Sequence, residues 1–370
     1  KSIISNLDLL VIDEISMVSS GVMEMIEYRL NQFGFNGRVL VVGDFLQLPP
    51  VRKNNEEKRL MVQYAIKEEE QERYFGYAFD SLSWGNFVFK KIELTTVKRT
   101  NDIEFISYLH NIRNGACDIG VKNFISSITS NRLDKETAYK STILYATNKK
   151  VKEYNEARLM ALDEPLFEMD AKIEVLSKSK DIDKKIDTYI ENLPIERVLK
   201  IKVGAPILFT TNTEEFKNGQ RGVVTKILND KDGYKIVILT DTKKEVVLAQ
   251  YPFELSHYEF EEKNDKTIQV KQNTLAKIKQ FPIKLAWSLT IHKSQGMSID
   301  NIAVFIDEIF EKSQFYVAIS RATSVNGLLL LSKKDKIWLD GWIEKMISVD
   351  EKVVDFYMNY HKFSIRKNLF

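Results

Sequence analysis

The sequence predicts an α/β protein with two parallel-sheet units and a β-rich insertion in the second. Strongly apolar, strand-length runs alternate with helix-length stretches at both ends of the chain. Residues 165–284 have a different texture, in which short strand-like pieces lie between turn residues. At 370 residues the chain is also long for one domain, so two or three compact units are expected.

A strand, a helix and a second strand are predicted within residues 7–43. LDLLVI (7–12) is apolar on both faces, as a buried parallel strand is, and RVLVVG (38–43) repeats the pattern. Ser19 and Ser20 can cap the helix between them. Because this is a crossover connection, the two strands should be parallel. The helix is expected to bury the apolar residues Val22, Met25, Ile26, Leu30 and Phe33.

The remaining elements follow in chain order. Residues 52–73 are charge-dense and predict a surface excursion with some helix. The second α/β unit begins near Leu94, with a helix around 102–114 and a strand at 141–147. After the insertion, the α/β texture returns with a strand at NIAVFID, a helix around 312–322 and a strand at GLLLLS. Turns of the insertion are predicted at Asn218-Gly219, Asn229-Asp230 and Asp232-Gly233.

Composition excludes several classes of protein. The net charge is only +2, so any nucleic-acid-binding surface would have to be local. The one cysteine, Cys117, excludes an internal disulfide framework, fits a reducing compartment and is expected to be a buried or half-buried side chain. No apolar run approaches the ~20 residues that span a bilayer. These features predict a soluble, cytoplasmic protein with no membrane partner.

Acidic residues stand at the ends of both predicted strands of the first unit. Asp13 and Glu14 follow the first strand, and Asp44 follows the second. Ligands of open parallel sheets bind at this edge, where an Asp can hold Mg²⁺ and a Glu can orient water. The alternative is that Asp13-Glu14 only caps the following helix. Gln47, in GDFLQLPPV (43–51), is placed to sense a phosphate, unless this is merely a Pro-terminated loop.

These motifs resemble the Pif and RecD branch of superfamily-one DNA helicases. DEIS (13–16) and GDFLQLPPV are similar to the second and third helicase motifs, and further similar segments follow in the same order along nearly the whole chain. The branch moves 5′ to 3′ on DNA. The other segments that carry the resemblance are YAFDSLSW, ELTTVKRTNDIEF (93–105), YATNKKVKEYN (145–155), VGAPILFTTN…NGQRGVV (203–224), AWSLTIHKSQGMSID (286–300) and FYVAISRATS (315–324).

The resemblance implies two RecA-like domains, the first incomplete, with an inserted SH3-like β-barrel module. The implied boundaries are 1–92 for the first domain, 93–164 and 285–370 for the second, and 165–284 for the insertion. It also implies the cofactors ATP and Mg²⁺, the latter on Asp13, with Glu14 activating water. Gln47 and Gly296 would contact the nucleotide. Arg99 and Arg321 would stabilise the transferring phosphoryl group, although arginines of α/β proteins are more often salt-bridged or solvated.

Residues around TIHKSQG (290–296) are implied to contact single-stranded DNA. They are of the types that bind phosphates without reading bases. The alternative for His292 is a hydrogen-bonded structural histidine. The implied DNA contacts are Thr147, Asn148, Thr290, His292, Lys293 and Ser294. A strip of lysines near Phe281 also suits a single-strand path, or else is a solvated face; it consists of Lys263, Lys266, Lys271, Lys277, Lys279 and Lys284.

One motif of the family is missing from the sequence. The phosphate-binding G-x-x-x-x-G-K-[ST] does not occur, and the nearest match, from Gly115 to Gly120, lacks the lysine. We therefore expect a helicase without its amino-terminal segment, monomeric, acting on single-stranded and on duplex or structured DNA in repair and recombination, and hydrolysing ATP poorly as it stands. The alternatives are a non-catalytic single-strand-binding protein derived from a helicase and an RNA-directed motor.

Overall fold

The structure, a computed structural model, describes residues 3–50, 67–132, 134, 137, 141–177, 181–231, 233–262 and 268–365. The chain forms two compact units. The first comprises Lys1–Asp134 and Ile291–Phe370, and the second comprises Lys135–Thr290. The domain boundaries expected from the sequence differ from this division and stay a prediction.

The predicted strand–helix–strand unit is confirmed. Strands β1 (Leu9–Ile12) and β2 (Arg38–Val41) are parallel, with Leu9 opposite Arg38, and α1 (Ser20–Gln32) connects them. The hydroxyl of Ser19 accepts a hydrogen bond from the backbone N–H of Val22 and so caps the helix. The helix cap is therefore Ser19, and the acidic pair 13–14 is left for another role.

The prediction that these strands are buried on both faces is wrong. Leu9 is 50% exposed and Leu40 is 47% exposed, and their neighbours Val11 and Val42 are similarly open. Side chains alternate between the faces of a strand, and the described residues cover only the other face. The expected face of α1 is also partly wrong, because Met23 and Leu30 are buried whereas Val22 and Met25 are exposed.

The first unit also contains a second group of parallel strands, together with several helices. β16 (Ile302–Phe305), β17 (Leu328–Leu331) and β3 (Thr129–Ser130) run parallel, β17 pairing with both others. The predicted helices near 102–114 and 312–322 are confirmed as α4 (Ile103–Arg113) and α9 (Lys312–Ile319). The other helices are α3 (Glu68–Tyr74), α5 (Ile119–Ser127), α10 (Lys336–Met346) and α11 (Glu351–Ile365). Single 3₁₀ turns are Ile3–Asn6, Ile15–Met17, Ala78–Asp80, Trp84–Phe87, His292–Ser294 and Val325–Gly327.

An aromatic cluster joins the last helix to the first strands. The ring of Phe45 makes edge contacts with Phe79, Trp84 and Phe356, and Phe79 stacks on Phe356. Val353, on α11, is completely buried in the same core. Residues near both ends of the sequence therefore share one hydrophobic core.

The second unit contains one parallel strand pair and a β-rich region. β4 (Thr142–Tyr145) pairs in parallel with β15 (Ser288–Thr290), and α7 (Asn148–Met160) follows β4. Strands β11, β10, β9, β8 and β14 form an antiparallel sheet in that order, β12, β13 and β6 form another, and β5 pairs with β7. Their bounds are β5 (Phe167–Asp170), β6 (Lys172–Val175), β7 (Val198–Ile201), β8 (Pro206–Phe209), β9 (Arg221–Asp230), β10 (Gly233–Thr240), β11 (Glu245–Leu248), β12 (Tyr251–Glu262), β13 (Ile268–Gln280) and β14 (Ile283–Leu285).

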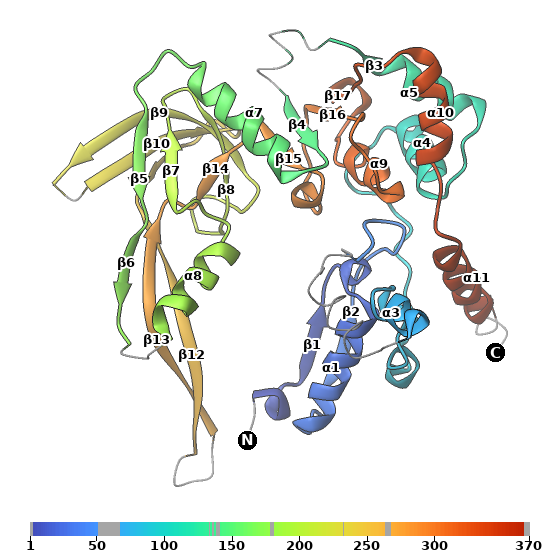
Figure 1. Ribbon diagram of the computed structural model, residues 1–370, viewed down its shortest axis with the longest axis horizontal. Helices are drawn as coiled ribbons and strands as arrows, with labels where there is room; N and C mark the ends of the chain where they lie inside the picture. Colours follow the sequence, from blue (N-terminus) through green and yellow to red (C-terminus); the bar gives the residue numbers. More distant parts are fainter. Residues whose placement is uncertain are drawn as a thin grey trace. The chain divides into compact units, whose positions relative to one another are not determined.

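The β-rich insertion is confirmed, and its closure as an SH3-like barrel stays a prediction. Figure 1 shows the long β12–β13 hairpin with α8 (Ile182–Asn192) lying along it. This helix was not predicted, although Ile182, Ile186 and Ile190 recur at helical spacing and pack into a core with the hairpin. Residues 52–66, Asp232, Lys263 and Lys266 lie outside the described residues, so the expectations for them stay open. In the described parts of the chain, no helix has the length and hydropathy needed to cross a bilayer.

Candidate active site

Glu14 has a strained backbone at the carboxyl end of β1. Its φ of 49° and ψ of 47° are in the left-handed region, which costs a non-glycine residue energy and is concentrated at functional sites. The Asp13 carboxylate accepts a hydrogen bond of 2.8 Å from the backbone N–H of Glu14 and stabilises this turn. The backbone of Glu14 is therefore fixed before any ligand arrives.

The loop after β2 lies directly against this turn. A Cβ atom at Gly43 would lie 2.8 Å from the backbone nitrogen of Ile15, so only glycine allows the two loops to approach so closely. The backbone N–H of Ile15 donates to the carbonyl of Val42 at 3.0 Å. This contact places Gln47, on the same loop, beside Glu14, as the sequence predicted for the two strand ends.

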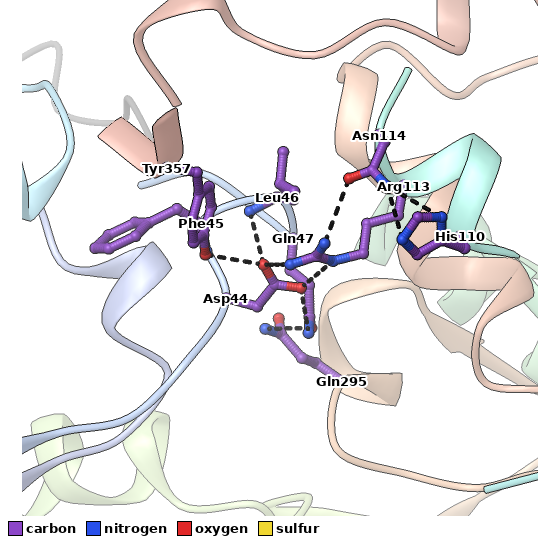
Figure 2. A network of polar contacts seen from close by, with 9 residues as sticks. All are labelled: Asp44, Phe45, Leu46, Gln47, His110, Arg113, Asn114, Gln295 and Tyr357. Atoms are coloured by element: carbon purple, nitrogen blue, oxygen red, sulfur yellow. Dashed lines mark hydrogen bonds and ion pairs between the residues drawn. The ribbon is translucent and has the colours of Figure 1, made fainter. Parts of the chain in front are cut away.

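Asp44 anchors this loop to two helices (Figure 2). Arg113, the last residue of α4, donates Nε and Nη2 to the two carboxylate oxygens at 2.9 and 2.8 Å. Tyr357, on α11, donates its hydroxyl to the same carboxylate at 3.2 Å and accepts from the backbone N–H of Phe45. Burial raises the pKa of Tyr357, and the charge of Asp44 raises it further. Asp44 is thus a structural anchor whose acceptor positions are occupied.

Gln295 connects the two strand-end loops to the TIHKSQG segment. Its Nε2 donates to Oε2 of Glu14 at 2.7 Å and lies 3.5 Å from Oε1 of Gln47. Gln47 in turn places its own Nε2 3.5 Å from Asp44, so that amide and carboxylate groups follow one another across the site (Figure 2). Gly296, which follows Gln295, has a φ of 77°.

Arg99 and Arg321 both bond to Ser320, and their proposed role in catalysis stays a prediction. Arg99 donates to the carbonyl of Ser320 at 2.7 Å, and Arg321 donates to the hydroxyl of the same serine at 2.8 Å. Neither has a carboxylate partner within the described ranges. Burial, followed by the like charge of Arg99, lowers the pKa of Arg321 from its ordinary value to about 10. Burial also lowers the pKa of Arg99.

The chemistry of this residue set fits a magnesium-bound polyphosphate. A buried arginine, Arg321, and a half-buried one, Arg99, with no acidic partners among the described residues, suit an anion. A guanidinium offers fixed donors to phosphate oxygens. Carboxylate oxygens of the kind that Asp13 carries suit Mg²⁺. Glu14 interacts electrostatically with Arg321. Its negative charge raises the pKa of Arg321, whereas burial lowers it.

The residues expected to contact DNA fall in both units. In the second unit, Thr147 caps α7, Asn148 is the first residue of that helix, and Thr290 ends the neighbouring strand β15. In the first unit, His292, Lys293 and Ser294 form a 3₁₀ turn. Lys293 is exposed, whereas Ser294 is buried and its hydroxyl donates to the carbonyl of Ile291 at 2.7 Å. Their roles toward DNA stay predictions.

Two lysines of the predicted strip have acidic partners. Lys277 lies 3.1 Å from Glu254, and Lys279 lies 3.8 Å from Glu174. Phe281 is completely buried in the core of the insertion and cannot stack on a base there, so this part of the prediction is wrong. An aromatic residue beside lysines in the sequence was taken for a surface residue, but it follows β13 at the point where the chain enters the core.

Sequence reasoning did not assign site roles to Arg113, Tyr357 or Gln295. Gln295 lies within TIHKSQG, so its motif was noticed while its own contact was not. Arg113 ends a predicted helix, where a cation is common for the helix dipole alone. Tyr357 is 313 residues from Asp44, and no local signal marks such a contact.

Comparisons with known proteins place these features among helicases. Residues 1–123 match the family model described as PIF1-like helicase, and residues 260–334 match one described as Helicase. The chain is 38% identical over 365 residues to the ATP-dependent DNA helicase Pif1 of Campylobacter jejuni, covering 98% of this chain and 77% of that protein. It is 29% identical to the ATP-dependent DNA helicase PIF1 of the rat, covering 95% of this chain but only 49% of the rat protein.

Solved structures agree with the sequence comparison. One is the crystal structure of the Pif1 helicase from Bacteroides in complex with ADP-AlF3 and single-stranded DNA. It has a TM-score of 0.63 and 25% sequence identity, and the match covers 96% of this chain and 76% of that one. The predicted fold class is thereby confirmed.

Proposed function

We propose that this chain, which belongs to the PIF1-like helicase family, carries the part of an ATP-dependent DNA helicase that senses and hydrolyses the nucleotide. The pair Arg99 and Arg321 supports this most directly. The buried guanidinium of Arg321 and the half-buried one of Arg99 share Ser320 and lack an acidic partner among the described residues, as is suitable for a phosphoryl group. The Bacteroides relative was crystallised with a phosphate-mimicking ADP complex and single-stranded DNA.

In the proposed reaction each residue has one task. Glu14 accepts the proton of the attacking water at its carboxylate. Gln47 and Gly296 contact the nucleotide. Arg99 and Arg321 hold the γ-phosphoryl oxygens and stabilise the charge that develops on them. Mg²⁺, held by Asp13, would supply further positive charge to the phosphates when it is bound.

DNA would be held by residues from both units. Thr147, Asn148 and Thr290 of the second unit, and His292 and Lys293 of the first, are proposed to bind backbone phosphates without reading the bases. The two RecA-like domains would alternate in their grip on a single strand, with movement from 5′ to 3′, as the family resemblance implies. Duplex or structured DNA would be opened by this movement.

The sequence contains no phosphate-binding G-x-x-x-x-G-K-[ST] loop. That loop supplies backbone N–H groups and a lysine to the β- and γ-phosphates. We therefore infer that these 370 residues alone hydrolyse ATP poorly, and the activity is best tested in the full product of the gene.

The test is the rate of ATP hydrolysis by the full gene product, with and without single-stranded DNA, and by its Glu14→Gln variant. We expect DNA to stimulate hydrolysis, and the variant to lose it at least ~100-fold because the base is gone. DNA affinity in the absence of nucleotide should be unchanged, since Glu14 contacts no proposed DNA residue. Duplexes with a 5′ or a 3′ single-stranded tail, compared in the same assay, test the direction of movement.

If Glu14→Gln hydrolyses ATP normally, Glu14 is not the base. If the wild-type protein binds DNA without hydrolysing ATP, the proposed activity is wrong and the chain is a binding protein derived from a helicase.

A further inference from the structure

The contact between Gln295 and Glu14 is a short hydrogen bond to the proposed general base. It measures 2.7 Å and joins residues 281 positions apart. The amide orientation follows from the partner: a reversed amide would place two oxygen atoms at this distance, and a carboxylate can only accept. Gln295 therefore donates its N–H to Glu14.

This bond leaves one carboxylate oxygen of Glu14 available. Nε2 of Gln295 is bonded to Oε2, and the backbone of Glu14 is already held by Asp13. With main chain and side chain both held, Oε1 can be directed at a water molecule in a fixed orientation. A general base needs such an alignment with the proton that it takes.

Oxygen Oε1 of Gln295 points to an incomplete site. It is buried, and among the described residues no donor reaches it. Buried amide oxygens are nearly always hydrogen-bonded, so one that is unpaired among the described residues, at a proposed reaction centre, indicates a place for a donor from a ligand or solvent. A water molecule held for attack would be such a donor.

The backbone of Gln295 belongs to the turn that is proposed to contact DNA. Its N–H donates to the carbonyl of His292 at 3.2 Å, and His292–Ser294 form the 3₁₀ turn. Only Ser294 lies between the exposed Lys293 and Gln295. A ligand that moves or stiffens the turn therefore acts on the position of the Gln295 amide.

We propose that Gln295 is a positioning residue for Glu14, and that DNA bound at the 292–294 turn stimulates ATP hydrolysis through the Gln295–Glu14 hydrogen bond. The proposal rests on the function proposed above. In this proposal the side chain of Gln295 couples the DNA-binding turn to the ATP site. Such coupling is reciprocal, so the nucleotide should also change the affinity for DNA.

The experiment compares the full gene product with its Gln295→Ala and Gln295→Glu variants. The matched control is Gln32→Ala, which removes an exposed glutamine at the end of α1 that bonds only to Arg29. For each protein, kcat and KM for ATP are measured with and without oligo-dT, together with oligo-dT affinity in the presence and absence of ADP-aluminium fluoride.

For Gln295→Ala we expect the stimulation of kcat by DNA to fall about ten-fold, the size expected for one hydrogen bond to a charged group. KM for ATP, DNA affinity without nucleotide and Tm should match those of Gln32→Ala. The effect of ADP-aluminium fluoride on DNA affinity should disappear. Gln295→Glu replaces the amide donor by a carboxyl group beside Glu14, so the stimulation of kcat by DNA should be lost in this variant as well.

Unchanged stimulation in Gln295→Ala or in Gln295→Glu would overturn the proposal while leaving the helicase function intact. A wild-type protein that hydrolyses no ATP would instead overturn the proposed function itself. The two failures are therefore distinguishable in one set of measurements.

Discussion

Arg321 shows how a functional residue can reduce stability. It is only 3% exposed, its guanidinium bonds to a backbone carbonyl and a serine, and its nearest charged neighbour is another arginine. Its pKa, about 10, is below the ordinary value of an arginine, which applies in the unfolded chain. The buried charge therefore costs stability at every pH below about 10, and the cost is relieved only as the pH rises above that value.

Replacing Arg321 by Met should therefore separate stability from activity. Met fills a similar volume without charge, and we expect it to raise the free energy of unfolding by ~1 kcal/mol at pH 7, since replacing a buried charge by an apolar group is often stabilising. ATP hydrolysis by the full gene product should be lost. Urea unfolding and hydrolysis rates check the two effects. A variant that is both less stable and active would contradict this account.

At the scale of elements, the ends of α4 and α11 hold the loop after β2. The two side chains that bond to the Asp44 carboxylate are on helices. Arg113 is the last residue of α4, and Tyr357 is on α11. The carboxylate and the guanidinium are each mostly shielded from solvent, so this pair is less screened than a surface ion pair. The loop that carries Gln47 thus depends on two helices from elsewhere in the chain.

Removing Arg113 should destabilise the first unit measurably. Arg113→Ala leaves the Asp44 carboxylate partly buried without its main partner, and we expect a loss of ~2 kcal/mol in the free energy of unfolding. Lys122→Ala, which breaks the exposed pair with Glu344, is the matched control and should have a far smaller effect. Urea denaturation of both variants measures the difference. Equal losses would show that Asp44 is not an anchor.

The elements differ in how far the sequence could predict them. Local patterns, namely two apolar runs and a serine cap, predict β1, α1 and β2. The positions of the acidic residues at the strand ends follow from the same prediction. α8 could have been predicted from its isoleucine spacing. The contacts of Asp44 with Arg113 and Tyr357 could not, because they join residues 69 and 313 positions apart and no local pattern identifies the partner. The same applies to Gln295 and Glu14.

For the whole molecule, the attraction to DNA has to come from local groups of positive charge. The net charge of +2 gives little general attraction to DNA, so individual phosphate contacts should decide affinity. Lys293 is the exposed cation of the 292–294 turn. The lysines of the insertion that are paired with Glu254 and Glu174 have less charge to offer.

Lys293→Ala should weaken binding to oligo-dT and oligo-dA equally and should reduce the slope of log affinity against log salt by about 0.7, the loss of one phosphate contact on a single strand. Fluorescence anisotropy at several salt concentrations measures both quantities. Lys277→Ala is the control and should leave the slope unchanged. If only the control changes the slope, DNA follows the insertion instead of the turn.

The shared core of Phe45 and Val353 has a consequence for biosynthesis. A ribosome adds roughly 5–20 residues per second, so about 15 to 60 s pass between the synthesis of these two residues. During that time the aromatic side chains around Phe45 have no α11 to cover them. The nascent chain must keep this apolar surface from other proteins until α11 emerges, so we expect chaperones that act at the ribosome to bind it during synthesis.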